Sequence, residues 1–334
     1  MKIIFLSNEP SNVKNVYPKA MMDALAKENG GNELLIVKSC ELEAHKAEIA
    51  DTEYAFSTWG MPQLTEDEIE EYLPSLKAVF YGAGSVQSFA RPFLNKNIKV
   101  FSAWAANAVP VAEYTVAEII LSGKGVFNAS RLFKEQGRDA ASKFTHKFRG
   151  NYGAKVGLIG AGMIGSLVAE MLKAYHFEVL VFDPFLPVEK AEKLGVKMAS
   201  LEEIFSECQV ISNHLANNPQ TVGMLNYDLF SLMGDYSTFI NTGRGAQVVE
   251  ADLIRAMKEK PTRTALLDVT FPEPPEEDSE FYTLPNVILT PHCAGSQSDE
   301  LYRMSEYVIS EYRALVAGEP TKYEVTLKML ETMA

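Results

Sequence analysis

Cysteine is scarce in this 334-residue sequence, which contains only Cys40, Cys208 and Cys293 and no Cys-x-x-Cys pair. So few and so widely spaced cysteines argue against a disulfide framework and a structural zinc site, and they fit a reducing compartment. No stretch approaches the roughly 18 uninterrupted apolar residues of a membrane span. The opening apolar run, residues 3–6, is too short for a secretory signal. We therefore expect a cytoplasmic protein with no metal site and no membrane partner.

Basic residues are outnumbered by acidic ones, with 31 Lys and Arg against 44 Asp and Glu and a net charge of −13. The mean field of such a chain repels nucleic acid, so we expect no nucleic-acid partner. Hydrophobic residues make up 47% and charged residues 22%, a balance typical of globular proteins rather than disordered ones. At roughly 150 residues per domain, the length predicts about two domains.

Short β-rich runs alternate with amphipathic helical patterns along the whole chain. In the first third, strand-like runs at 2–6, 33–37 and 78–81 alternate with helical patterns at 17–27 and 65–72. This alternation predicts βα units around a parallel sheet, and hence an α/β protein.

A long helical pattern follows Asn107, and Pro110 is expected to mark its start, because proline is tolerated only in the first turn of a helix. The breaker-rich stretch 137–153 separates this pattern from a second α/β alternation over 155–291. Residues 298–317 then read as a final helix. The chain is therefore predicted to form two α/β units joined by long helices.

An apolar strand at 155–159 runs into a Gly-x-Gly-x-x-Gly loop and a helical pattern. After a second strand, Asp183 follows 23 residues beyond Gly160. This is the arrangement of a dinucleotide-binding unit, with the pyrophosphate at the positive end of the helix. The predicted loop contacts are Gly160, Gly162, Met163, Ile164 and Gly165.

Asp183 is expected to accept hydrogen bonds from the adenosine ribose hydroxyls and to repel a 2′-phosphate. The following residues, 184–187, contain no Arg or Lys that would hold such a phosphate. The sequence therefore favours NAD over NADP as the cofactor.

Three further apolar strands each end in a polar group, namely Arg244, Glu273 and His292. Open α/β sheets bind their ligands at these strand ends. Together the three residues supply an anion clamp, an imidazole and a carboxylate that orients it. This set suits hydride transfer to a 2-keto acid, with His292 as the general acid and Arg244 holding the substrate carboxylate.

The motifs together resemble those of the D-isomer-specific 2-hydroxyacid dehydrogenase family. They are the glycine loop with its aspartate, Asn-x-x-Arg-Gly at 241–245, Asp-Val-x-x-x-Glu-Pro at 268–274 and Thr-Pro-His at 290–292. The resemblance covers nearly the whole chain and is most specific over 155–295. It implies two Rossmann-like, doubly wound parallel-sheet domains, with the cofactor domain inserted into a flavodoxin-like substrate domain.

The resemblance also implies a role for each matching residue. Arg244 should bind the substrate carboxylate and polarise the keto group, and His292 should donate or remove the proton. Glu273 should hydrogen-bond the imidazole and favour its protonated form. Asp268 matches a residue near the nicotinamide carboxamide. The other cofactor-lining positions are Leu215, Thr242, Gly243 and Gly295.

The implied domain boundaries place residues 1–105 and 297–334 in the substrate domain and residues 106–296 in the NAD-binding domain. The long helices after Asn107 are expected to build a homodimer. In the substrate domain, the backbone N–H groups of Ala83, Gly84 and Ser85 match a loop that meets the substrate carboxylate.

The sequence departs from the family pattern at a few positions, which puts the identity of the 2-hydroxy acid in doubt. Ala216 replaces a usual proline, the loop at 81–88 lacks a Gly-x-Asp pattern, and Gly243 stands where alanine or serine is frequent. Trp59, Tyr81 and Trp104 are expected either to line an aromatic pocket or to serve as packing residues.

Two other functions compete with the dehydrogenase. An NAD(H)-sensing, corepressor-like binding protein on the same fold would keep the same triad, although we see no disordered, motif-bearing tail of the kind such proteins carry. A formate dehydrogenase is disfavoured, because that relative replaces the carboxylate partner of the histidine with an amide, whereas Glu273 is a carboxylate.

Overall fold

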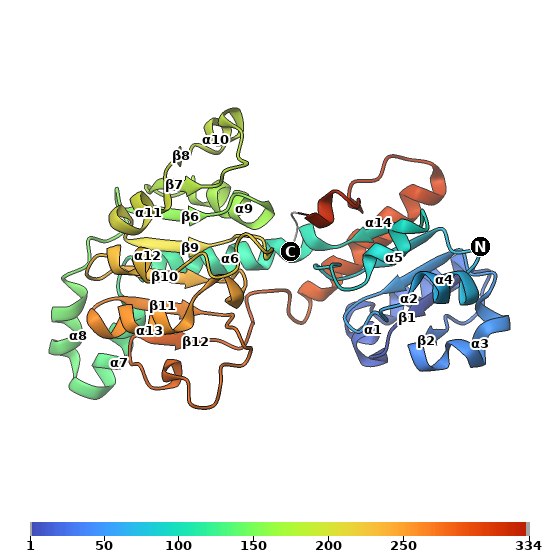
Figure 1. Ribbon diagram of the computed structural model, residues 1–334, viewed down its shortest axis with the longest axis horizontal. Helices are drawn as coiled ribbons and strands as arrows, with labels where there is room; N and C mark the ends of the chain where they lie inside the picture. Colours follow the sequence, from blue (N-terminus) through green and yellow to red (C-terminus); the bar gives the residue numbers. More distant parts are fainter. Residues whose placement is uncertain (1, 332–334) are drawn as a thin grey trace. The chain divides into compact units, whose positions relative to one another are not determined.

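The computed structural model describes residues 2–331, and the chain divides into two compact units (Figure 1). Unit 1 is formed by the chain up to Asn107 and again from Ser296 onward, and unit 2 by Ala108–Gly295. The second unit is therefore an insertion in the sequence of the first. Each unit is built around its own sheet of largely parallel strands.

Unit 1 contains a six-stranded sheet in the order β13-β5-β4-β3-β1-β2. All neighbours are parallel except β13, which pairs antiparallel with β5. The strands are β1 (Ile3–Leu6), β2 (Ile36–Val37), β3 (Tyr54–Ser57), β4 (Ala78–Tyr81), β5 (Lys99–Ser102) and β13 (Glu324–Val325). The strand order reverses between β1 and β3, as in a doubly wound sheet.

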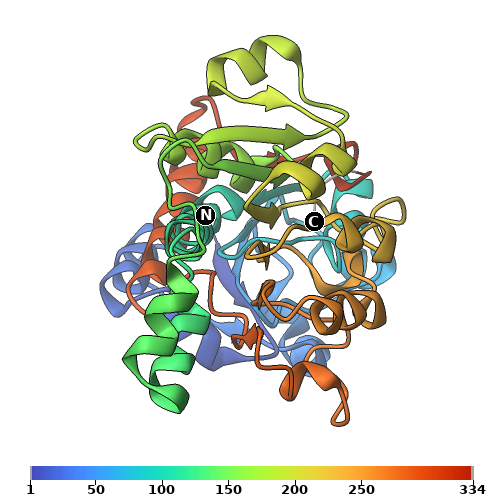
Figure 2. The same cartoon turned by 90° about the vertical axis from the view of Figure 1, so that its left-hand side faces the viewer.

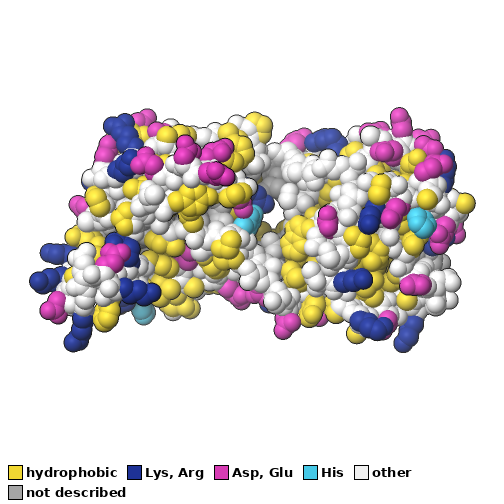
Figure 3. Space-filling model, turned by 90° about the horizontal axis from the view of Figure 1, so that it is seen from below, with side chains coloured by type: hydrophobic (Ala, Val, Ile, Leu, Met, Phe, Trp, Pro, Cys, Tyr) yellow, Lys and Arg dark blue, Asp and Glu magenta, His cyan; other side chains and the backbone are white. Residues whose placement is uncertain are grey.

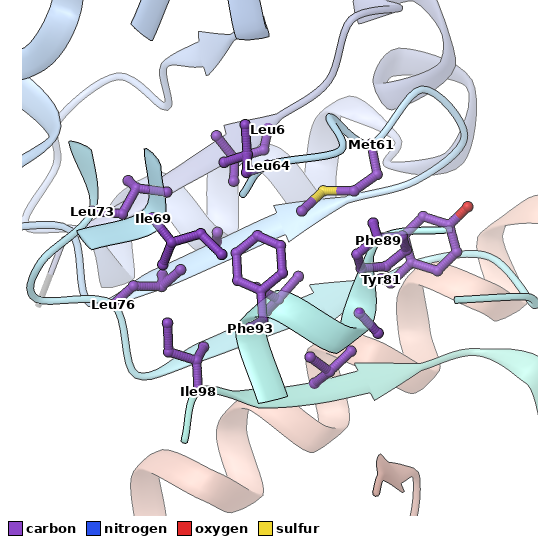
Figure 4. Close-up of a cluster of buried hydrophobic side chains, with 14 of the residues drawn as sticks. Leu6, Met61, Leu64, Ile69, Leu73, Leu76, Tyr81, Phe89, Phe93 and Ile98 are labelled. Carbon is purple, nitrogen blue, oxygen red and sulfur yellow. The ribbon is translucent and has the colours of Figure 1, made fainter. Parts of the chain in front are cut away.

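The helices of unit 1 are α1 (Pro10–Val16), α2 (Lys19–Glu28), α3 (Leu42–Ile49), α4 (Glu66–Tyr72), α5 (Ala90–Asn95) and α14 (Glu300–Ala317). One apolar cluster packs against α4 and α5, and Figure 4 shows Tyr81 beside Phe89 within it, with ring centroids 4.8 Å apart. A second cluster on β1, β3 and β4 includes Tyr312 of α14. Buried strands with apolar residues in succession are what a sheet covered on both faces requires.

Unit 2 contains a seven-stranded parallel sheet in the order β12-β11-β10-β9-β6-β7-β8. Its strands are β6 (Lys155–Ile159), β7 (Glu178–Phe182), β8 (Lys197–Met198), β9 (Val210–Asn213), β10 (Thr238–Asn241), β11 (Thr264–Leu267) and β12 (Val287–Leu289). The chain builds outward from β6 to β8 and then returns to place β9 beside β6. This reversal creates the switch point at which such sheets bind ligands.

The helices of unit 2 are α7 (Val126–Gln136), α8 (Arg138–Thr145), α9 (Met163–Leu172), α10 (Val188–Leu194), α11 (Leu201–Glu207), α12 (Tyr227–Leu232) and α13 (Glu250–Glu259). Helices α7 and α8 pack side by side and are drawn in green in Figure 2. The predicted fold class of two doubly wound α/β domains is confirmed. No helix in the described part of the chain has the length and hydropathy needed to cross a membrane.

Helix α6 (Trp104–Ser122) corrects one expectation, because it begins six residues before Pro110 rather than at it. Proline cannot donate the backbone hydrogen bond expected at this point of a helix. The helix nevertheless continues through Pro110. Ala106 is buried in a core of unit 1 and Ala112 in a core of unit 2. Packing on both sides of the proline therefore outweighs the lost hydrogen bond.

Candidate active site

The three polar strand ends predicted from the sequence lie on adjacent parallel strands. Asn241 at the end of β10 pairs with Leu267 of β11, which pairs with Leu289 of β12. Because parallel strands end at the same edge of a sheet, the segments that carry Arg244, Glu273 and His292 all leave from that edge. The sheet register thus brings together residues that are 48 positions apart in the sequence.

His292 and Glu273 form the central contact of the site. The imidazole Nδ1 lies 2.7 Å from Oε1 of Glu273, and both side chains are partly exposed, at 49% and 42%. His292 adopts a left-handed backbone conformation with φ of 55°, which is uncommon for a non-glycine residue and costs on the order of 1 kcal/mol. With Nδ1 committed to Glu273, the ring's Nε2 is the nitrogen left for a ligand.

Asp268 holds the segment that carries His292. It is 4% exposed, and its Oδ1 accepts hydrogen bonds from the hydroxyl of Thr290 at 2.6 Å and from the N–H of Cys293 at 2.8 Å. Its Oδ2 accepts from the N–H of Ala294 at 2.9 Å. Both carboxylate oxygens are therefore engaged by the chain itself. Its expected place beside the nicotinamide stays a prediction.

The guanidinium of Arg244 contacts the neighbouring backbone. The side-chain Nη1 donates to the carbonyl of Gly243 at 2.8 Å. Burial lowers the pKa of Arg244, whereas the negative charge of Glu273 raises it. Arg244 and Glu273, the partner of His292, therefore interact electrostatically.

A buried amide network, which sequence reasoning missed, supports this arginine. The Nδ2 of Asn213 donates to Oδ1 of Asn241 at 3.0 Å and to Oε1 of Gln247 at 2.6 Å. The Nδ2 of Asn241 donates to the Arg244 carbonyl at 3.3 Å. A side chain at Gly243 would approach Asn213 Nδ2 to 3.0 Å. A side chain there would require the Asn213 amide to shift slightly.

The glycine loop leaves an open, positively polarised helix end. Gly160 has φ of 96°, and a Cβ at Gly165 would lie 2.0 Å from the Gly160 carbonyl oxygen, so both positions require glycine. Gly162, the N-cap of α9, provides no side-chain cap, and a Cβ there would meet nothing within 4 Å. The start of α9, where Met163 and Ile164 lie, is therefore not capped by a side chain. An anionic pyrophosphate fits this arrangement.

Asp183 anchors the glycine loop through its carboxylate. Its Oδ2 accepts from the N–H of Ala161 at 2.7 Å and its Oδ1 from the N–H of Phe185 at 2.8 Å. A carboxylate offers about four acceptor positions, so two remain for ribose hydroxyls. Sequence reasoning missed Lys190 of α10, whose Nζ lies 3.4 Å from the Ala161 carbonyl. Although residues 184–187 contain no basic residue, Lys190 therefore places a positive charge near the glycine loop.

The remaining predicted cofactor positions lie around the ends of β9 and β10 and after β12. The Leu215 carbonyl accepts from Gln247, and the hydroxyl of Thr242 lies 3.1 Å from that of Thr115 on α6. Gly295 follows the Asp268-bound segment and is the last residue of unit 2. Beside Leu215, burial lowers the pKa of His214 to about 4, so this ring is neutral.

The predicted substrate residues of unit 1 follow β4. The carbonyls of Ala83 and Gly84 accept from the Ser102 hydroxyl at 2.9 and 2.6 Å, and Ser85 is exposed. Tyr81 lies in the core beside Phe89, and so serves packing rather than a pocket (Figure 4).

The two tryptophans of unit 1 differ in their surroundings. Trp104 packs edge-on against Tyr323, with ring centroids 5.7 Å apart, and so has a packing role. Trp59 is 40% exposed.

Charged side chains of both signs are interspersed over the face seen in Figure 3. Within residues 2–331, no group of three His, Cys, Asp or Glu side chains is arranged to hold a metal ion.

Residues 117–294 match the family model "D-isomer specific 2-hydroxyacid dehydrogenase, NAD binding domain". The chain is 31% identical to D-3-phosphoglycerate dehydrogenase of Archaeoglobus fulgidus over 71% of its own length and 44% of that protein. It is 28% identical to D-3-phosphoglycerate dehydrogenase of Bacillus subtilis over 87% of its own length and 56% of that protein. The match thus spans about half the length of these curated relatives.

The fold is shared with D-lactate dehydrogenase of Lactobacillus jensenii, solved with NAD+. The TM-score is 0.75 at 22% identity, over 98% of this chain and 100% of that one. Fold likeness at this identity does not carry a substrate from one protein to the other. The family model, which covers more than half of the chain, does establish descent. The chain belongs to the D-isomer specific 2-hydroxyacid dehydrogenase family, and its unit 2 carries that family's NAD-binding domain.

Proposed function

We propose that this protein is an NAD-dependent dehydrogenase that interconverts a small 2-keto acid and the corresponding D-2-hydroxy acid. The observation that carries the proposal is the 2.7 Å contact between His292 and Glu273 at the sheet edge that also carries Arg244. An imidazole oriented by a carboxylate is an acid–base group, and a guanidinium next to it is a carboxylate clamp.

In the proposed reaction, His292 handles the proton. With Nδ1 bonded to Glu273, the ring presents Nε2, which donates a proton to the keto oxygen during reduction and removes it during oxidation. Arg244 binds the substrate carboxylate with two parallel N–H bonds and polarises the keto group. The backbone N–H groups of Ala83, Gly84 and Ser85 are proposed as further partners of that carboxylate.

Bound NADH would supply the hydride, and the residues of unit 2 would hold the dinucleotide. The N–H groups at the start of α9 would bind the pyrophosphate, and Asp183 the adenosine ribose. We propose that NAD is preferred over NADP, because the Asp183 carboxylate repels a 2′-phosphate. Lys190 opposes this repulsion, so the preference is expected to be smaller than Asp183 alone would produce.

We further propose that the protein is a homodimer. Three apolar side chains of α6 and α7, Leu121, Val126 and Phe133, are 38–55% exposed, and contact with a second copy would bury them. The cytoplasmic location expected from the few cysteines stays a prediction.

The proposed activity is tested with a panel of small 2-keto acids and NADH, followed by NADH absorbance. Reduction of at least one keto acid to the D isomer, lost in His292→Ala with NADH affinity retained, is the expected result. Inactivity across the panel combined with tight NADH binding would contradict the proposed enzyme activity and favour a cofactor-sensing protein. Loss of NADH binding in His292→Ala would mean that the variant does not report on acid–base chemistry.

A further inference from the structure

A basic segment leads into β6 in an otherwise acidic chain. Residues 143–155 contain four Lys and Arg and no Asp or Glu, whereas the whole chain has a net charge of −13. The proposed reaction uses none of these residues. A local excess of positive charge attracts anions.

Part of this segment lines a cavity of about 450 Å³ in unit 2, within the range of about 300–1,000 Å³ that small-molecule sites occupy. The cavity lies at the amino ends of three strands, because Lys155 begins β6, Gln209 directly precedes β9 and Ser237 directly precedes β10. The glycine loop follows the opposite end of β6, a five-residue strand roughly 16 Å long. The cavity is therefore separate from the predicted cofactor site.

Three aromatic rings line the cavity. Phe148 and Tyr236 have ring centroids 5.4 Å apart, and both rings pack against Phe144 behind them. The third ring, that of Tyr152, belongs to a side chain that is 86% exposed. Rings of this kind bind a planar apolar group by stacking.

Two positive charges at the cavity have no partner in the protein. Among the residues that the structure describes, Lys147 and Arg149 form neither an ion pair nor a side-chain hydrogen bond, and both are exposed. A guanidinium can bind a carboxylate or a phosphate with two parallel N–H bonds, and an ammonium adds a second positive charge.

The other ionisable groups of the lining have partners nearby or are uncharged. The Lys155 ammonium lies 2.6 Å from a carboxylate oxygen of Glu207. The negative charge of Asp235 acts on the buried guanidinium of Arg263, whose pKa burial lowers and Asp235 raises. Burial raises the pKa of the Cys208 thiol to about 12, so this thiol is uncharged. The lining therefore has three basic and two acidic side chains, which favours an anionic ligand.

We propose that this cavity binds a small planar anion, namely an aromatic ring that bears a phosphate or a carboxylate group. The ring would stack on the three aromatic side chains, and the anionic group would pair with Lys147 and Arg149. None of the side chains assigned to the proposed dimer interface lines the cavity. Because the cavity lies at the opposite ends of the strands from the candidate active site, the proposal does not depend on the dehydrogenase activity.

The test uses the full chain saturated with NADH, so that a probe with a ring and a phosphate cannot occupy the cofactor site. The probes are adenosine 5′-monophosphate and 2-naphthoate, and their uncharged counterparts are adenosine and 2-naphthamide. Binding is followed through the backbone amide NMR signals of residues 147–155 and 234–237. Shifts of these signals locate the ligand at the cavity and give its Kd.

Two variants change the cavity in different ways. Arg149→Ala removes one of the unpaired cations, and Arg138→Ala, an exposed position on α8 outside the cavity, is the matched control. Gly234→Leu fills open space, because a Cβ at Gly234 would meet no atom within 4 Å and the backbone there does not have a positive φ. Thermal unfolding shows whether each variant folds, and Arg149→Ala carries the test if Gly234→Leu does not fold.

At least one anion should bind, and its Kd should rise about tenfold in Arg149→Ala, the equivalent of one charge-assisted hydrogen bond, but stay unchanged in Arg138→Ala. Gly234→Leu should abolish the shifts. Binding of only one of the two anions would identify a phosphate or a carboxylate as the recognised group.

Three results would overturn the proposal. The first is that neither anion shifts these signals at millimolar concentration. The second is an equal Kd for an anion and its uncharged counterpart, which would remove the role of charge. The third is an equal Kd in the parent and in Arg149→Ala.

Discussion

At the scale of single residues, the contact between His292 and Glu273 makes a prediction about activity. In Glu273→Gln the amide oxygen can still accept a hydrogen bond from the His292 ring, whereas in Glu273→Ala the ring loses this partner. Glu273→Gln should therefore keep more of the parent's kcat/KM than Glu273→Ala, in both directions of the reaction. Equal kcat/KM in the parent and in Glu273→Ala would separate Glu273 from the acid–base pair.

Arg244 provides a prediction about geometry rather than charge. Arg244→Lys keeps a positive charge but replaces a planar fork of donors with a point charge. The variant should lose on the order of 2–4 kcal/mol of transition-state stabilisation in kcat/KM. A kcat/KM of Arg244→Lys within about threefold of the parent value would mean that the guanidinium does not bind the substrate.

Glu118 provides a prediction about stability. Its pKa is raised in the folded chain, so between the unfolded value near 4.3 and the folded value of about 8 the native state binds more protons, and stability falls as pH rises. Glu118→Gln removes this dependence and should stabilise the protein at pH 7 by on the order of 1–3 kcal/mol. Thermal unfolding at several pH values measures it. A variant that is less stable than the parent at pH 7 would contradict the assignment of a buried, protonated carboxyl.

The sequence was informative at this scale about where Arg244, Glu273 and His292 lie, because each follows an apolar strand, while their roles stay predictions. It was uninformative about Gln247 and Glu118, whose roles depend on side chains that only the packed sheet and α6 bring near them. A glutamate in a helical pattern is normally solvated, and nothing in the local sequence marks this one as buried.

At the scale of elements, two glycines of the loop before α9 should respond differently to the same substitution. A Cβ at Gly165 would lie 2.0 Å from the Gly160 carbonyl, so Gly165→Ala should cost about 1–3 kcal/mol of stability. A Cβ at Gly162 meets no protein atom, so Gly162→Ala should fold normally. It should still weaken NAD binding by roughly tenfold, about 1.4 kcal/mol, by filling the space for the pyrophosphate. Thermal unfolding and NAD titration of both variants separate the effects. If Gly165→Ala and Gly162→Ala behaved alike in both assays, the assignment of Gly165 to packing and Gly162 to pyrophosphate binding would be wrong.

Element boundaries were predicted best where side chains themselves mark them. Thr65 caps α4 by accepting from the Glu68 N–H at 3.2 Å, and the pattern 65–72 predicted that helix within a residue. The prediction that α6 starts at Pro110 was wrong, because a proline marks a helix start only when packing does not stabilise the preceding turn. Helix α1, which starts at Pro10, was not foreseen, since its seven residues show little periodicity.

At the scale of the whole molecule, the proposed dimer makes a prediction about assembly. Phe133 is 55% exposed on α7, and burying such a ring between copies contributes about 1.5–3 kcal/mol. Phe133→Asp should therefore convert the dimer to monomer in light scattering at micromolar concentration. Val222→Asp, at an equally exposed position of unit 2, is the control and should leave the mass unchanged. If light scattering shows that the parent is a monomer, the proposed homodimer is wrong.

The fold class could be predicted from the alternation of strands and helices, since that pattern depends on local residues. The two-residue strands β2, β8 and β13 carry no periodicity of their own, and their pairing is set by the neighbouring strands. That the chain returns to its first unit near the end was expected from family resemblance alone. No local sequence pattern predicts that Glu324 pairs with Phe101.

The return of the chain to unit 1 has a consequence for biosynthesis. Tyr312 of α14 packs against Tyr54, Phe56 and Phe80, so these three aromatic side chains lack this part of their cover until α14 leaves the ribosome. Unit 2, Ala108–Gly295, is translated in the interval, which takes roughly 10–40 s at ordinary elongation rates. The unit that begins first is therefore completed last. During that time the nascent chain exposes an aromatic surface for which a chaperone and a neighbouring nascent chain would compete.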